Sequence, residues 1–402
     1  MKDTILVFGT TYNQVPMIRK IQEMGFHAWA TSAGDCSSCD GVADRILDVD
    51  TSDADALLEI VQKEGIRGLL TCGTSTAICT IAYINEKLDL SRKVIPYEVA
   101  LNATIKENFQ RILAPAGIVP RGDTAASAEE AVEKSRALAL PIVLKPVDGG
   151  GGKGVEVVEE RSRAALHDAF ARSLAYSRAK RLMVEEYIAG VTLGVESITL
   201  DGVTHVLAVA EKSLAGFPNC VTTGVFFPSP RLEPHLEKIA QVNREAIARL
   251  GIEWGPTHID MVLRDGGAPC IVDVGPRLAG GPIASTLIES ATGYDLYGAA
   301  IGLGIGEDVP APCIDRTQTA VYGSHFIVRD ESGTISAIGY DRERASDLGL
   351  LDFRLLKRAG DRIDGIVTDG DRLAVFHLSA ATREEMLEKI RAAEDAFRLE
   401  VS

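Results

Sequence analysis

The stretch that decides the fold runs from Thr257 to Arg277 and reads THIDMVLRDGGAPCIVDVGPR. Two apolar runs flank the turn residues DGGA at 265–268, which is the pattern of a β-hairpin. Symmetric pairing about that turn predicts Arg264 opposite Pro269, and the same count places Asp260 opposite Asp273. Directly opposite residues on antiparallel strands have Cβ atoms about 4.5 to 5.5 Å apart, where like charges repel. The pattern therefore indicates that something holds two carboxylates together.

A divalent cation with oxygen ligands is the natural partner of Asp260 and Asp273. Mg²⁺ usually keeps several waters and takes further ligands from substrate phosphates, and Mn²⁺ is the alternative ion. The competing interpretation is a solvent-exposed sheet face on which water screens both charges. Arg277, which follows a Gly-Pro break, could supply a fixed donor for an anionic reactant or a developing oxyanion.

A second informative stretch, LPIVLKPVDGGGGKGVEVV at residues 140–158, joins two strand-like runs through a glycine-rich loop. Only glycine lets backbone N–H groups approach a phosphate so closely, so the loop resembles a phosphate lid. A P-loop is excluded because the loop leads into a strand rather than a helix. A flexible surface hairpin would also explain the glycines, but it would not explain Lys145 on the strand before them.

The remaining patterns give the organisation of the chain. The first hundred residues alternate strands and helices, which predicts a parallel sheet with helices on its faces. The first turn, residues 9–14, lacks the later glycines of a dinucleotide fingerprint, which favours a docking or substrate-side domain over nicotinamide binding. Residues 99–120 are predicted to be helical and carry Lys106, and residues 234–250 form a second amphipathic helix. Short strands and a final helix after residue 310 predict a third, α+β domain.

Composition excludes several classes of function. A chain of 402 residues is expected to form two or three domains. The net charge of −15 disfavours a nucleic-acid partner, and no segment has the apolar length of a membrane helix. Seven cysteines without a secretion signal predict reduced thiols in the cytoplasm. The pair Cys36 and Cys39 is interpreted as part of an ordinary loop, with zinc or redox chemistry as the alternative.

Taken in order, these motifs resemble the ATP-grasp carboxylate–amine ligases, in particular the L-amino-acid-ligase-like branch. The resemblance covers nearly the whole chain. It implies a fold of mixed α/β and α+β class with three parts: a Rossmann-like pre-ATP-grasp domain at residues 1–98, an ATP-grasp domain of two α+β subdomains at 99–305, and a C-terminal domain of the amino-acid-ligase type at 306–402.

The resemblance also implies roles for individual residues. In TIKENFQ and LPIVLK it points to two ATP-binding lysines, and in MVEEYIAG to a hinge that holds adenine. The hairpin aspartates would bind Mg²⁺, and Arg277 would lie near an acyl phosphate. Lys212 falls where the family often has a phosphate- or substrate-side lysine. The implied nucleotide-binding residues are Lys106, Lys145, Gly149, Gly150, Gly151, Gly152, Lys153, Gly154, Glu185, and the backbone of Glu186 and Ile188.

Three features depart from the family pattern. Both metal carboxylates are aspartates where glutamate is usual, which shortens their reach by one methylene. Gly275 stands where the family has an asparagine ligand. Thr192 stands near the position of the acidic residue that commonly binds the ribose, which leaves Glu196 as the substitute.

The implied reaction is ATP-dependent ligation. A substrate carboxylate, expected to belong to an amino acid, takes the γ-phosphate of ATP, and an amine then displaces phosphate to form an amide or peptide bond, leaving ADP and phosphate. Two alternatives remain open: a carboxylase-type enzyme that activates bicarbonate, and a non-catalytic nucleotide-binding module. A homodimer is an ordinary expectation for such a protein.

Overall fold

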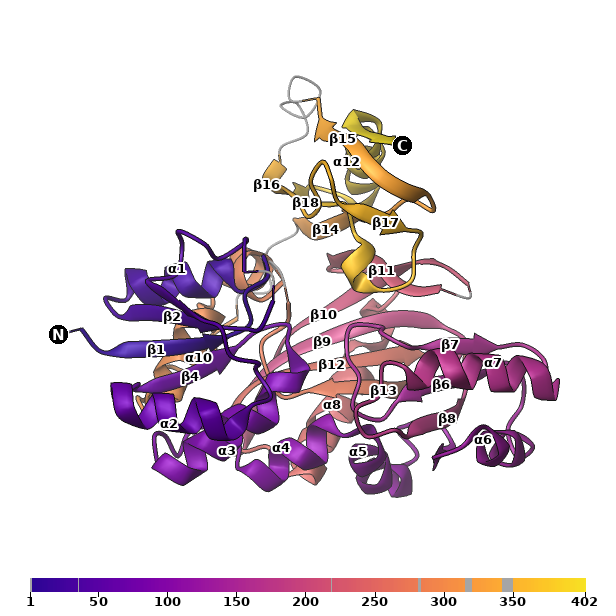
Figure 1. Cartoon of the computed structure of the whole chain (residues 1–402), viewed down its shortest axis with the longest axis horizontal. Helices are drawn as coiled ribbons and strands as arrows, with labels where there is room; N and C mark the ends of the chain where they lie inside the picture. The colour runs from indigo at the N-terminus through magenta and orange to yellow at the C-terminus, as the bar shows by residue number, and fades with distance from the viewer. Residues whose placement is uncertain (1, 35, 218, 281–282, 315–319, 342–349) are drawn as a thin grey trace.

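The computed structural model describes residues 2–34, 36–217, 219–280, 283–314, 320–341 and 350–402 (Figure 1). The N-terminal part is a four-stranded parallel sheet in the order β3-β2-β1-β4, which confirms the predicted alternation. The central strand β1 is buried from Ile5 to Phe8, as expected for a parallel strand with both faces covered. Its elements are β1 (Thr4–Phe8), α1 (Val15–Glu23), β2 (His27–Thr31), β3 (Arg45–Leu47), α2 (Ala54–Glu64), β4 (Gly68–Thr71) and α3 (Ile78–Leu88).

Residues 99–120 are mostly helical, as predicted, but they do not form one continuous helix. Two helices occur instead, α4 (Tyr97–Thr104) and α5 (Lys106–Leu113), because Ile105 takes an extended conformation with ψ of 116°. The backbone N–H of Lys106 donates to the carbonyl of Val147 at 2.9 Å. This break places Lys106 at the N-terminus of α5, beside the start of the glycine loop.

The glycine loop belongs to a four-stranded antiparallel sheet in the order β5-β8-β6-β7. The loop joins β6 directly to its neighbour β7, which confirms the predicted strand–loop–strand arrangement. Ser162 caps the following helix by accepting a hydrogen bond from the N–H of Ala165 at 3.1 Å, also as predicted. The elements are β5 (Gly122–Ala125), α6 (Ala128–Ser135), β6 (Ile142–Pro146), β7 (Glu156–Val158), α7 (Arg163–Leu174) and β8 (Leu182–Glu186).

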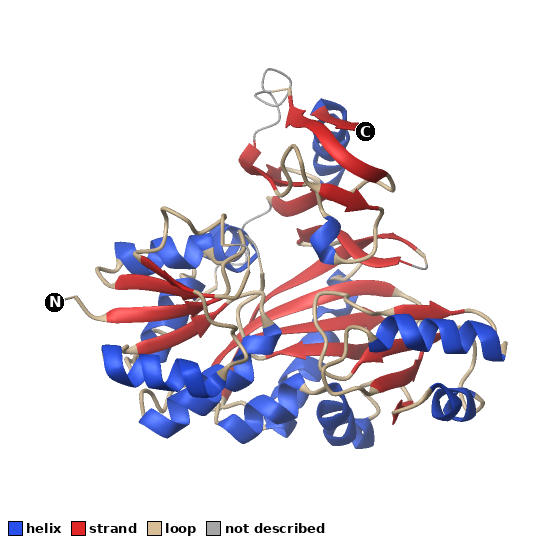
Figure 2. Ribbon diagram, in the orientation of Figure 1, coloured by secondary structure: helices blue, strands red, loops and turns tan. Residues whose placement is uncertain are grey.

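The largest sheet has eight strands in the order β13-β12-β9-β10-β11-β14-β18-β16, all antiparallel (Figure 2). The hairpin turn predicted at Asp201-Gly202 joins β9 to β10, and the helix ending at Gly251 is α8. Its elements are β9 (Val191–Leu200), β10 (Val203–Gly216), β11 (Asn219–Phe227), α8 (Leu236–Leu250), β12 (Gly255–Leu263), β13 (Pro269–Gly275), β14 (Val321–Ile327), β16 (Leu350–Leu355) and β18 (Ala374–Ala380).

Three strands of the C-terminal part, β14, β16 and β18, thus extend the same sheet that carries the aspartate hairpin. A smaller sheet and α12 (Arg383–Ala396) complete this part, and its strands are β15 (Ser332–Tyr340), β17 (Arg362–Asp364) and β19 (Phe397–Val401). The divisions proposed at residues 98 and 305 stay predictions. Within the described ranges, no helix has the length and apolar character needed to cross a membrane.

Candidate nucleotide and metal site

The aspartate hairpin has the predicted pair but not the predicted turn. Asp260 lies opposite Asp273, while Leu263, not Arg264, pairs with Pro269. The N–H of Gly267 donates to the carbonyl of Arg264 at 2.7 Å, and Gly267 has φ of +74°. This is a three-residue loop with glycine in the left-handed position, so the register near the turn is shifted by one residue.

A β-bulge restores the register. The pairing skips Val272 between Ile271 and Asp273, which brings Asp273 back opposite Asp260. The carbonyl of Val272 accepts a hydrogen bond from Nζ of Lys145 at 3.0 Å. The bulge therefore does two things at once: it aligns the two aspartates, and it ties β13 to the lysine strand β6.

Each aspartate of the pair is neutralised by a lysine. Nζ of Lys106 lies 2.7 Å from Oδ1 of Asp273 and also donates to the carbonyl of Gly149 at 2.9 Å. Nζ of Lys212 donates to Oδ1 of Asp260. These ion pairs explain how two carboxylates can face each other across the hairpin.

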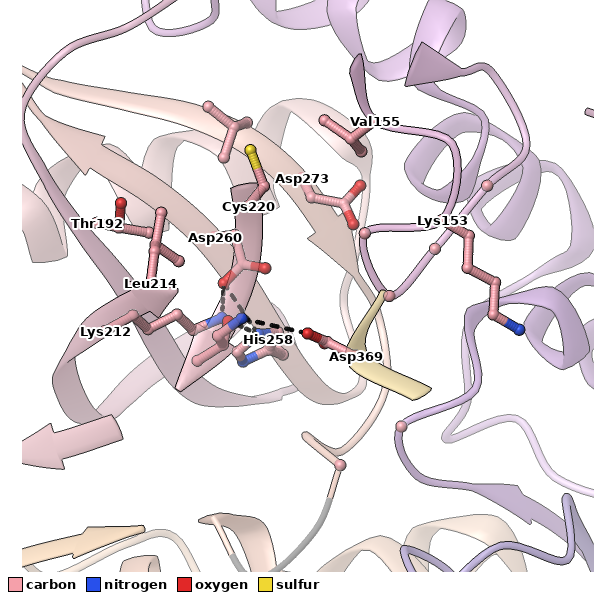
Figure 3. A pocket seen from close by; sticks show the side chains of 18 of the residues that line it. Lys153, Val155, Thr192, Lys212, Leu214, Cys220, His258, Asp260, Asp273 and Asp369 are labelled. Carbon is pink, nitrogen blue, oxygen red and sulfur yellow. Dashed lines mark hydrogen bonds and ion pairs between the residues drawn. The ribbon is translucent and has the colours of Figure 1, made fainter. Parts of the chain in front are cut away.

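A buried histidine stands behind Asp260. His258 contacts Asp260 through Nε2 at 3.1 Å (Figure 3), and its Nδ1 contacts the carboxylate of Glu196. Burial opposes ionisation of Asp260, but Lys212 and His258 together lower its pKa below the ordinary value. Burial likewise opposes a charge on His258, and the two carboxylates beside it outweigh that effect and raise its pKa. The site thus carries a carboxylate that stays ionised.

Glu196 does not have the position predicted for a ribose ligand. Its side chain is 3% exposed, does not line the cavity, and is occupied by His258. A side chain so placed cannot reach a sugar in the cavity. Thr192 does line the cavity, at the position where the family pattern predicted an acid.

The hinge residues lie on β8 and just beyond it. Glu185 makes a buried ion pair with Lys145, with 2.6 Å between Oε2 and Nζ. Glu186 donates its N–H to the carbonyl of Arg121 at 2.9 Å, so only its carbonyl is left for an adenine amino group. In the described part of the chain, no hydrogen bond is made by the N–H of Ile188. One acceptor and one donor on neighbouring backbone suit the edge of a purine.

The hinge is also fixed against the aspartate hairpin. The Glu186 carboxylate accepts hydrogen bonds from Arg121 and from Arg264, at 3.1 and 3.2 Å. Gly190, which ends the hinge with φ of +149°, lies so close to Leu263 that a Cβ would collide with the Leu263 carbonyl. Glycine is required there because the two backbones meet.

The glycine lid, residues 147–155, lies over this site. Gly151, Gly152 and Gly154 have positive φ angles of 63°, 73° and 71°, which other residues rarely adopt. Residues 149–153 all line the cavity. Gly154 packs against Pro146 instead and does not line the cavity. Lys153 is exposed and points away from the aspartates (Figure 3). The lid therefore offers backbone amides to a phosphate more directly than it offers its lysine.

Arg277 enters the cavity from the loop after β13. Its guanidinium donates to the hydroxyl of Ser75 at 3.3 Å and to the carbonyl of Leu278 at 2.9 Å. Among the described residues, no carboxylate pairs with it. A side chain at Gly275 would meet this guanidinium, since a Cβ there would lie 3.2 Å from its central carbon. Glycine in place of the family's asparagine thus leaves room for Arg277.

Most of these groups line one cavity of about 660 Å³, to which the N-terminal part, the aspartate hairpin, the lid and the C-terminal part all contribute. The predicted residues that line it are Lys106, Lys145, Gly149, Gly150, Gly151, Gly152, Lys153, Glu185, Glu186, Ile188, Lys212, Asp260, Asp273 and Arg277. Other lining residues were not singled out individually from the sequence, and they include Tyr12, Cys220, Thr222, Val272, Phe326, Asp369 and Arg372.

The cavity has the donor set expected for Mg²⁺ and a nucleotide. Asp260 and Asp273 supply two carboxylates, and no group of three or more His, Cys, Asp or Glu side chains suited to a metal occurs in the described ranges. An ion bound by only two protein carboxylates would complete its shell with water and substrate phosphate, which is the usual arrangement for Mg²⁺.

Comparisons with known proteins agree with this geometry. Residues 106–281 match the model of an ATP-grasp domain, and residues 325–402 match that of L-amino acid ligase C-terminal domain 2. The crystal structure of an L-amino acid ligase from Bacillus licheniformis aligns over the whole of both chains with a TM-score of 0.82 and 19% identity. A phosphoribosylglycinamide synthetase from Anaerococcus prevotii aligns equally completely, with a TM-score of 0.73 and 18% identity.

Relatives found by sequence include an uncharacterised protein and a section of carbamoyl phosphate synthase. An uncharacterised protein of Sinorhizobium fredii is 27% identical over 92% of this chain and 76% of its own. The N-terminal section of the carbamoyl phosphate synthase large chain of Methanopyrus kandleri is 26% identical over 66% of this chain, which spans only 48% of that relative. The chain thus contains an ATP-grasp domain, followed by a C-terminal domain of the kind found in L-amino acid ligases.

Proposed function

We propose that the chain is an ATP-dependent carboxylate–amine ligase that forms an amide or peptide bond through an acyl phosphate. One observation carries the proposal: two facing aspartates, each held by a lysine, lie beneath a glycine lid in the same cavity as an arginine that has no described acid partner. Phosphoryl transfer requires mainly positioning and neutralisation of charge, and these groups can supply both.

Each group has a role in this reaction. The hinge at Glu185 to Ile188 would hold adenine, and Lys106 and Lys145 would bind the phosphates. Mg²⁺ held by Asp260 and Asp273 would neutralise charge on the phosphate oxygens. Lys106 and Lys212 would then exchange their aspartate partners for phosphate oxygens. The closed lid would exclude water, so that the acyl phosphate meets an amine instead of being hydrolysed.

Arg277 would stabilise the developing charge at the substrate carboxylate. A guanidinium without a described counter-ion, fixed by Ser75 and Leu278, is already oriented toward an incoming anion. The carboxylate substrate is proposed to be an amino acid, and the nucleophile a second small amine. A cytoplasmic location and a homodimer stay predictions.

We expect phosphate release that requires ATP, Mg²⁺, a carboxylic acid and an amine together, with ADP as the nucleotide product. ADP is expected because the proposed metal ligands and Lys106 lie beneath the glycine lid, where they would neutralise the terminal phosphates of ATP. A screen of paired acids and amines, with nucleotide products resolved by chromatography, measures this. AMP and pyrophosphate as products would contradict the proposal.

The same screen separates the two alternatives. Incorporation of labelled bicarbonate into product would favour a carboxylase-type reaction. Tight ATP binding without phosphate release across the whole panel would favour a nucleotide-binding module.

A further inference from the structure

A short C-terminal segment reaches the same cavity as the nucleotide site. The 3₁₀ turn η5 (Asp369–Asp371) lies between β17 and β18, and Asp369, Gly370 and Arg372 line the cavity with Lys212 and Asp260. Figure 3 shows Asp369 entering from the C-terminal part with its carboxylate toward His258 and Lys212. No role in the nucleotide site described above uses this carboxylate.

Arg372 is held rigidly beside Asp369. Its guanidinium stacks over the ring of Phe326, 4.0 Å from the centroid, and its Nε donates to the carbonyl of Thr222 at 2.9 Å. Nη2 lies 2.7 Å from Oδ1 of Asp369. The hydroxyl of Tyr12, from the N-terminal sheet, also bonds to this guanidinium. An arginine fixed from four sides fixes the carboxylate that it holds.

The partners of Asp369 leave half of the carboxylate available. Oδ1 accepts from Arg372 and from the N–H of Thr222 at 3.3 Å, whereas Oδ2 has no hydrogen bond among the described residues. The side chain is 33% exposed, and that exposure is in the cavity. Burial raises the pKa of Asp369, although Arg372 and Lys212 oppose the shift. Its two neighbouring cations do not fully offset the effect of burial on the charged form. One more cation beside this carboxylate would therefore stabilise its charged form.

We propose that Oδ2 of Asp369 binds the ammonium group of the carboxylate substrate, which makes that substrate an amino acid; this rests on the proposed ligase function. Lys212 is paired with Asp260 in this structure, and in the proposed reaction it would pair with a phosphate oxygen, so it is not left to bind Asp369. The ammonium group of an amino acid can donate to Oδ2 while the carboxylate of the same molecule lies in the same cavity, where Arg277 attracts it.

Protonation decides whether Asp369 binds the amino group of the activated acid or the attacking amine. A carboxylate beside an amine favours the protonated ammonium form. The attacking amine must lose its proton before it can displace phosphate, so a fixed carboxylate partner would oppose its reaction. The amino group of the activated acid must instead stay out of the reaction. Asp369 would keep it protonated and so decide which amino acid supplies the carbonyl.

The experiment uses hydroxylamine as the amine, so that the natural nucleophile need not be known. The full-length chain is given ATP, Mg²⁺ and either an L-amino acid or the acid that lacks only its amino group, for example L-alanine against propionate and L-leucine against 4-methylpentanoate. Hydroxamate formation gives kcat/KM for each acid. The variants are Asp369→Asn, which keeps shape and removes charge, and Asp364→Asn, the same change on an exposed residue at the end of β17, outside the cavity.

We expect Asp369→Asn to lower kcat/KM for the amino acid about 10- to 100-fold, the usual range for a lost charged hydrogen bond. The desamino acid should change less than about twofold, and Asp364→Asn should resemble the unmodified chain. Nucleotide binding and thermal unfolding of the variants show whether the fold is kept. Should Asp369→Asn fail to fold, the unmodified chain still provides a test, because it should prefer each amino acid over its desamino partner.

Two negative outcomes are distinguishable. Equal turnover of amino and desamino acids by the unmodified chain, or equal losses for both acids in Asp369→Asn, overturns the role of Asp369 and leaves the ligase function standing. Absence of hydroxamate with every acid overturns the ligase function and this inference with it.

Discussion

Replacing Asp260 by asparagine is expected to lower ATP-dependent phosphate release more than about 100-fold. Loss of a residue that only orients a metal ligand typically costs about 10- to 100-fold in affinity or activity, and a direct ligand should cost more. The change would also remove the carboxylate that pairs with both Lys212 and His258. Mn²⁺ binding followed by electron paramagnetic resonance should weaken in parallel.

The matched control for this change is Asp265→Asn. Asp265 lies in the turn of the same hairpin, is exposed, and does not line the cavity. It should leave phosphate release and Mn²⁺ binding close to those of the unmodified chain. Equal losses for the two variants, or normal Mn²⁺ binding by Asp260→Asn, would show that Asp260 does not bind the metal.

Replacing Lys145 by methionine should both destabilise the fold and abolish nucleotide binding. Lys145 and Glu185 form an ion pair in which both side chains are less than a tenth exposed, at 7% and 3%. Removal of one partner leaves the other charge buried and uncompensated, which typically costs about 3 to 5 kcal/mol. Urea unfolding would measure that loss, and titration with a fluorescent ATP analogue would measure binding.

A double variant separates the two effects. Lys145→Met combined with Glu185→Gln removes both charges and should recover much of the lost stability, because no buried charge is left unpaired. Nucleotide binding should not recover, since one of the two lysines proposed to bind the phosphates is still missing. Recovery of binding together with stability would mean that Lys145 supports the fold and does not contact ATP.

The hairpin shows what a sequence pattern can and cannot establish. Turn residues and alternating apolar runs were enough to pair Asp260 with Asp273, and the pairing is confirmed. Two features of the hairpin were not predicted: the loop has three residues instead of two, and Val272 forms a β-bulge. The longer loop and the bulge each shift the pairing by one residue, in opposite directions. The predicted register was therefore wrong near the turn but correct at the two aspartates.

The positions of other site residues depend on contacts with residues that are distant along the chain, and local sequence patterns do not reveal such contacts. Helical periodicity continues through residues 97–113, but at the break after Ile105 the N–H of Lys106 donates to the carbonyl of Val147, at the start of the lid. Spacing after the hinge suggested Glu196 for the ribose, yet strand alternation places that side chain against His258. Asp369 carries no local sign of its role, because Arg372, Thr222 and the cavity meet it only in the folded chain.

A crystal structure of the chain with Mg²⁺ and the non-hydrolysable ATP analogue adenylyl imidodiphosphate would decide whether this cavity holds the nucleotide. We expect one or two Mg²⁺ ions bound by both Asp260 and Asp273, the terminal phosphates beneath the glycine lid, and Lys106 moved from Asp273 to a phosphate oxygen. An analogue bound outside the cavity, or metal bound without either aspartate, would contradict the assignment of the site.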